Sequence, residues 1–143
     1  MAGWAADIFR AICFNAPYFS TIAPRLGALD VGRCEVRKRD RRSAHNDTGT
    51  VHAIALGNLA ALSAERMAEI AVPSGMRWVP RGMTTQHLAK ARRTMHAMAT
   101  PQSAVREAET GYLWPMSASV RDDAGLEVFR AQIDMWASPR PRR

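Results

Sequence analysis

The chain is poor in cysteine. Its 143 residues include only Cys13 and Cys34, which are too few for a disulfide scaffold or a four-ligand zinc site. We expect both thiols to be reduced and buried, as free cysteines usually are. A cytoplasmic setting follows, because disulfides are rare there. A domain of this length buries roughly two thirds of its unfolded surface and needs no metal or disulfide to fold, so neither a metal nor another cofactor is expected.

Long apolar runs are also absent. The most apolar stretch, residues 51–64, contains His52 and Asn58 and is shorter than the roughly 20 residues of a membrane-spanning helix. Near the N-terminus, Asp7 and Arg10 interrupt the apolar stretch, and no basic segment precedes it as it would in a signal peptide. The sequence therefore predicts a soluble protein with no membrane span.

Acidic residues are scarce relative to basic ones. Lys and Arg number 20 against 13 Asp and Glu, which gives a net charge of +7. Such a balance attracts polyanions such as nucleic acid, anionic lipid or a phosphorylated cofactor. Aromatic residues are not interleaved with the basic ones and no helix-turn-helix pattern occurs, so nucleic acid is not an expected partner. The basic run of residues 37–42 is interpreted as a solvated face.

Two short elements are predicted in the first third of the chain. Apolar residues recur at spacings of three and four over residues 3–14, which predicts an amphipathic helix within an N-terminal helical segment of residues 1–22. Residues 27–39 predict a first strand, with Leu29, Val31 and Val36 as apolar positions.

The clearest helix runs from Val51 to Ile70, because Leu, Ala and Met dominate this stretch and no proline occurs before Pro73. Thr48 or Thr50 is the predicted N-cap. Seven of the sixteen residues from 53 to 68 are Ala or Gly. A helix of such small residues lets a sheet close tightly around it.

Strands joined by short turns are predicted after this helix. They comprise residues 83–91 paired with 94–100 across Arg92 and Arg93, and residues 116–121 paired with 130–135 across a turn at 123–125. Residues 138–143 form a basic tail. Consecutive strands after one helix favour an antiparallel sheet and an α+β fold, here as a single domain of residues 1–143.

The stretch that opens the long helix carries a family resemblance. Asn46, Gly49, His52 and Ala53 are spaced as in the signature of hotdog-fold thioesterases of the phenylacetyl-CoA thioesterase type, which the chain resembles over roughly residues 25–137. Residues 76–83 and 120–125 look like segments of an uncharacterised bacterial branch of that superfamily.

The resemblance implies a long central helix wrapped by a curved antiparallel sheet, here with an extra N-terminal helix. It also implies a homodimer or a tetramer, with active sites at the dimer interface. The implied substrates are acyl-CoA or acyl-carrier-protein thioesters.

Within this resemblance, the backbone N–H of Ala53 is the candidate that polarises the thioester carbonyl, because a helix N-terminus favours negative charge. Asn46 is the candidate for holding the attacking water or the carbonyl. His52 is either catalytic or a structural residue of the loop. Lys90, Arg92 and Arg93 are candidates for binding coenzyme A phosphates, since these cations suit phosphate oxygens.

One departure from the family pattern leaves two functions open. The family has an Asp or Glu nine residues after the histidine, whereas this chain has Ala61. Glu65 and Asp47 are the candidate replacements. The first reading is an acyl-thioester hydrolase; the second is a non-catalytic hotdog protein that binds an acyl chain or hydrophobic metabolite. An acid that reaches the helix N-terminus in three dimensions would separate them.

Overall fold

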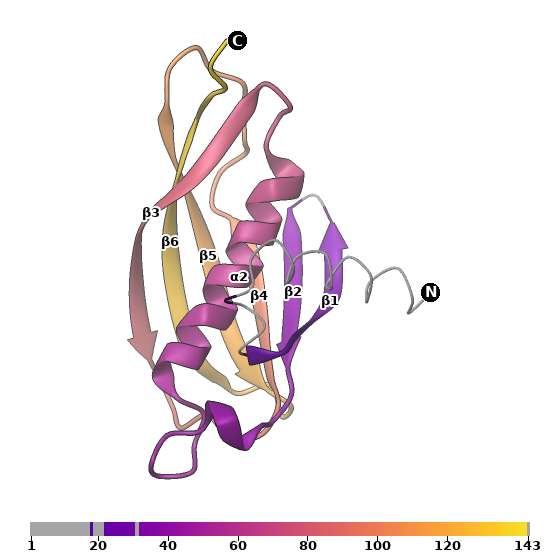
Figure 1. The fold of residues 1–143 in the computed structure, drawn as a ribbon, viewed down its shortest axis with the longest axis vertical. Coiled ribbons are helices and arrows are strands. Elements are labelled where there is room, and N and C mark those ends of the chain that lie inside the picture. Colours follow the sequence, from indigo (N-terminus) through magenta and orange to yellow (C-terminus); the bar gives the residue numbers. More distant parts are fainter. Residues whose placement is uncertain (1–17, 19–21, 31, 143) are drawn as a thin grey trace.

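The described part of the protein forms one long helix that lies across one face of a six-stranded antiparallel sheet (Figure 1). The computed structural model describes residues 18, 22–30 and 32–142. The strand order is β1-β2-β4-β5-β6-β3. The elements are β1 (Pro24–Asp30), β2 (Arg33–Lys38), the 3-10 turn η2 (Arg42–Ala44), α2 (Ala53–Ala71), β3 (Met76–His87), β4 (Met95–Pro101), β5 (Tyr112–Asp122) and β6 (Glu127–Pro139). This arrangement confirms the predicted α+β hotdog fold.

Helix α2 follows its predicted limits closely, and its small residues lie against the sheet as expected. Ala60 and Ala64 are fully buried. A Cβ added to Gly57 would lie 3.7 Å from the terminal methyl group of Met83, so the β3 strand approaches the helix closely at this point. The small side chains on this side of α2 therefore let the sheet curve closely around the helix.

The predicted N-cap of α2 was wrong. His52 is the N-cap, and its Nδ1 accepts a hydrogen bond from the N–H of Ile54 at 3.0 Å. Neither Thr48 nor Thr50 caps the helix, because both side chains are hydrogen-bonded to Asn46 instead.

The single strand predicted over residues 27–39 was also wrong. This segment is a hairpin in which β1 pairs antiparallel with β2. Gly32 has a φ of 102°, a left-handed conformation that glycine adopts without steric cost, and it reverses the chain. The helix predicted for residues 3–14 lies outside the described residues.

The strand after the helix has a different partner from the one predicted. β3 pairs with β6 at the edge of the sheet, whereas β4 lies between β2 and β5. Residues 88–94 are therefore a connection across the sheet, and Arg92 and Arg93 do not form a hairpin turn.

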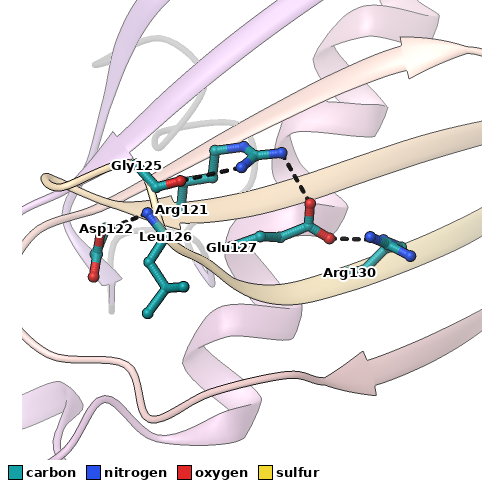
Figure 2. A network of polar contacts seen from close by, with 6 residues as sticks. All are labelled: Arg121, Asp122, Gly125, Leu126, Glu127 and Arg130. Carbon is teal, nitrogen blue, oxygen red and sulfur yellow. Dashed lines mark hydrogen bonds and ion pairs between the residues drawn. The ribbon is translucent and has the colours of Figure 1, made fainter.

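The predicted hairpin around residues 123–125 is confirmed (Figure 2). The Asp122 carboxylate accepts hydrogen bonds from the N–H groups of Ala124 at 2.9 Å and Leu126 at 3.0 Å. Gly125 has a φ of 86°. These local contacts close the turn between β5 and β6.

The core lies between α2 and the inner face of the sheet. Residues of β5 alternate between buried and partly exposed positions, as the period of a half-buried strand requires. Trp114, Met116, Ala118 and Val120 are all fully buried. In the part of the chain that is described, no helix is long and apolar enough to cross a membrane.

Strand β3 is the exception to this burial. It has one neighbour, β6, and from Val79 to His87 its residues are exposed on both faces. Val79 is 52% exposed and Met83 47% exposed. The structure therefore presents a long strand edge that carries apolar side chains.

Candidate active site

The loop before α2 is organised by Asn46. Its Oδ1 accepts hydrogen bonds from the N–H and hydroxyl of Thr48, at 3.1 and 2.8 Å, and from the N–H of Thr50 at 3.0 Å. Its Nδ2 donates to Thr50 Oγ1 at 2.8 Å. Asn46 thus closes the loop, while the second N–H of its amide remains available among the described residues.

The N-terminus of α2 is open to solvent. His52, Ala53 and Ile54 are all exposed. The Ala53 N–H belongs to the first turn, for which the helix supplies no acceptor, and the aligned peptide dipoles favour negative charge there. The loop of Asn46 leads directly into this turn. The first turn of α2 is therefore a favourable place for a group that carries negative charge.

His52 has a structural role in this arrangement. Because its Nδ1 accepts the Ile54 N–H, the ring is held against the helix end. The opposite ring nitrogen, Nε2, then carries the proton in the neutral form. The histidine that the signature singled out therefore caps the helix.

The basic loop between β3 and β4 lies against this site. The Val51 N–H donates to the Ala91 carbonyl at 2.8 Å, and Ala91 is 3% exposed. Lys90, Arg92 and Arg93 flank this buried alanine and are themselves exposed. The fold therefore brings the three predicted phosphate ligands close to the helix N-terminus.

Of the two candidate carboxylates, Glu65 lies far from Ala53 along the helix. It is four residues after Ala61 and therefore on the same side of α2. At 1.5 Å per residue, Glu65 is roughly 18 Å along the axis from Ala53. Burial raises the pKa of Glu65, and the neighbouring Arg66 opposes that shift. Asp47 is exposed in the same loop as Asn46 and is the nearer carboxylate by sequence.

Two inward-facing residues of β2 matter for the chemistry. Cys34 is a free, buried thiol, as predicted, and burial raises its pKa to about 12. It is therefore a poor nucleophile near neutral pH. Sequence reasoning missed Lys38, which is fully buried and donates from Nζ to the Arg39 carbonyl at 3.0 Å. The sequence does contain an indication that Lys38 is buried. It follows Cys34 and Val36 at intervals of two residues, so a strand places all three side chains on the same face.

The outer face of the sheet carries a separate charged network (Figure 2). Glu127 accepts from Arg130 Nε at 2.7 Å and from Arg121 Nη2 at 2.9 Å. The hydrogen bond from Arg130 is the main cause that lowers the pKa of Glu127. Since this face points away from α2, the network stabilises the β5–β6 hairpin. No group of three potential metal-ligating side chains occurs among the described residues.

Solved structures share this architecture. The structural-genomics target APC5556 is 38% identical to the chain, with a TM-score of 0.84 over 95% of this chain and 90% of its own. Thioesterase HI1161 from Haemophilus influenzae is 15% identical, with a TM-score of 0.78 over 90% of this chain and 87% of its own.

A thioesterase family protein from Silicibacter pomeroyi is 16% identical, with a TM-score of 0.78 over 95% of this chain and 99% of its own. No functionally curated protein matches the chain in sequence. A family model described as a domain of unknown function, DUF4442, matches residues 5–137.

Proposed function

Because the chain belongs to the DUF4442 family and has the fold of the thioesterases to which it is similar, we propose that it hydrolyses acyl thioesters. The substrate is an acyl-CoA or an acyl-carrier-protein thioester. The observation that carries the proposal is the open first turn of α2, in which Ala53 is exposed and which follows the loop closed by Asn46.

In this proposal the thioester carbonyl accepts a hydrogen bond from the Ala53 N–H. Attack by water moves negative charge onto that oxygen, which the preorganised N–H and the helix dipole stabilise. The free N–H of Asn46 Nδ2 orients the water or the carbonyl. Phosphates of the carrier bind Lys90, Arg92 and Arg93, whose loop is joined to the helix end through Val51 and Ala91.

We further propose that the active form is a homodimer, or a tetramer built from such dimers, formed by pairing β3 with β3 of a second copy. An unpaired edge with apolar side chains invites such pairing, and β3 offers Val79 and Met83 on an exposed edge. A carboxylate of the second copy, from Glu65 or Asp47, then completes the site.

The setting we propose is the cytoplasm, consistent with the free thiol of Cys34. The whole chain, residues 1–143, acts as one domain, with residues 1–22 as an N-terminal segment and residues 138–143 as a basic tail. The first residues of that tail are anchored, because the N–H of Arg140 donates to the Gly75 carbonyl at 2.9 Å.

A second function rests on Ala61. This chain has alanine at the position of the family carboxylate. The same fold and the same open helix end would also suit a protein that binds an acyl chain or hydrophobic metabolite without cleaving it. The two functions differ in whether thiol is released.

The test is hydrolysis of short, long and aromatic acyl-CoAs, with detection of the free thiol. We expect slow release by the wild type. Ala61→Glu should raise the rate on the order of 10²-fold, as for a positioned acid or base. The matched control is Ala124→Glu, in the exposed β5–β6 turn, which should leave the rate unchanged. No release by the wild type and no gain from a folded Ala61→Glu would favour the binding function. A hydrophobic ligand that copurifies would then be sought by mass spectrometry.

A further inference from the structure

A pocket of about 330 Å³ lies where β1 begins and β2 ends. In Figure 1 this is the end of the sheet at which α2 also begins. The two strands are neighbours there, because Pro24 pairs with Lys38. Among the described residues the pocket is lined by Ala23, Arg25, Arg39, Asp40 and Arg41. Nothing in the proposed hydrolysis uses these side chains.

Among its described residues, the pocket has more positive than negative charge. None of Arg25, Arg39 and Arg41 forms an ion pair within the described part of the chain. The carboxylate of Asp40 is already engaged, since its Oδ1 lies 2.5 Å from His45 Nε2. Three arginines therefore line the cavity, against one carboxylate that has its own partner.

The strand register adds to this charge. Arg25 of β1 lies directly opposite Arg37 of β2, and like charges in such a cross-strand pair repel each other. A bound anion offsets that repulsion, so the folded hairpin gains from occupancy of the pocket.

The backbone around the pocket is fixed. Ala23 has a φ of 44°, a conformation uncommon for residues other than glycine and found preferentially at functional sites. The carbonyl of Arg39 is held by Lys38 Nζ, and Lys38 is fully buried. The backbone that carries Arg39 is thus held in place by this hydrogen bond. Less conformational freedom of that backbone is then lost when an anion binds.

We propose that Arg25, Arg39 and Arg41 form an anion-binding site that takes a phosphate or pyrophosphate group. Guanidinium groups bind phosphate oxygens in pairs of parallel hydrogen bonds. A concave site of this volume suits a compact anion. The group comes either from the phosphorylated end of a thioester carrier or from a free nucleotide or phosphate. The site uses side chains that the hydrolase proposal does not use, although the loop that carries Lys90 leads into Met95, which pairs with Lys38 beside the pocket.

The test is calorimetric titration of the full chain with pyrophosphate, ATP and coenzyme A, near physiological ionic strength. Pyrophosphate should bind. Arg25→Gln and Arg41→Gln should each weaken binding about tenfold, the effect of one charged hydrogen bond. The matched control is Arg33→Gln, which removes the same charge from the far end of the same hairpin and should leave binding unchanged.

A second variant covers the case in which the arginine variants fail to fold. Asp40→Asn removes the only negative charge among the described residues of the pocket and should tighten pyrophosphate binding a few fold, a gain that misfolding does not mimic. Tighter binding of coenzyme A than of ATP would identify the thioester carrier as the source, and equal binding would identify a free nucleotide or phosphate.

The proposal is overturned by any of four results. The wild type does not bind pyrophosphate; Arg33→Gln weakens binding as much as Arg25→Gln; or the combined Lys90→Gln, Arg92→Gln and Arg93→Gln variant loses binding while Arg25→Gln retains it. An acidic protein that binds this face while pyrophosphate does not would also overturn it. A chain that binds pyrophosphate here without hydrolysing thioesters would leave this site intact and reject only the hydrolase.

Discussion

At the scale of single residues, Ala60 shows how tightly the sheet encloses α2. Its side chain is fully buried, so a larger one has no free space. Ala60→Leu should lower the free energy of unfolding by roughly 1–3 kcal/mol through overpacking, as measured by denaturant titration. Ala61→Leu is the control, because the next residue is only partly buried and should lose much less. Equal stability of the wild type and Ala60→Leu would contradict the tight enclosure.

Lys38 is the other residue whose burial has a measurable consequence. Burial lowers its pKa below the ordinary 10.5, with Asp40 opposing that shift. Between the lowered pKa and 10.5 the unfolded chain therefore binds more protons than the folded one. The free energy of unfolding rises with pH across that window, and this contribution is lost as the pH falls through the folded pKa.

Lys38→Met should remove this cost and stabilise the fold by about 1 kcal/mol or more. The difference in melting temperature between variant and wild type should shrink as the pH approaches 10.5, and taking the difference cancels the titration of other groups. A variant that is less stable than the wild type at neutral pH would show that the ammonium group is better satisfied than its single hydrogen bond indicates.

At the scale of elements, the loop that leads into α2 depends on one amide. Asn46→Ala removes the acceptor for three donors of Thr48 and Thr50 and should cost about 1–3 kcal/mol of stability, together with any thioesterase activity. Asn46→Asp keeps an acceptor but loses the N–H groups. It should therefore retain most of the stability and still lose activity. Full activity in Asn46→Asp would show that Asn46 acts only by shaping the loop.

At the scale of the whole molecule, the exposed edge of β3 sets the expected assembly. Light scattering at micromolar concentration should give about twice the mass of the 15.8 kDa chain. Met83→Lys should shift the protein to monomer, because an inward charge on an edge strand opposes pairing. Leu126→Lys is the control, since Leu126 is 54% exposed in the β5–β6 turn and Met83 is 47% exposed. A stable wild-type monomer would remove the proposed interface.

The sequence named candidate site residues but not the contacts that they make. Asn46 closes the loop that precedes α2, and its role with Ala53 stays a prediction. The docking of Ala91 against Val51 was not visible, since forty residues separate the two. The role of His52 as the N-cap was also not predicted, because threonine has the better capping propensity. In the structure, the side chains of Thr48 and Thr50 are hydrogen-bonded to Asn46 and do not cap the helix.

What the sequence by itself determined is local. The limits of α2 follow from its composition and from Pro73, and the β5–β6 hairpin follows from alternation on both sides of Gly125. What only the tertiary structure decided is which distant segments meet. β3 pairs with β6 instead of β4, because periodicity states which face of a strand is buried but not which neighbour supplies its hydrogen bonds. That choice places β3 at the edge, and with it the surface on which the proposed dimer depends.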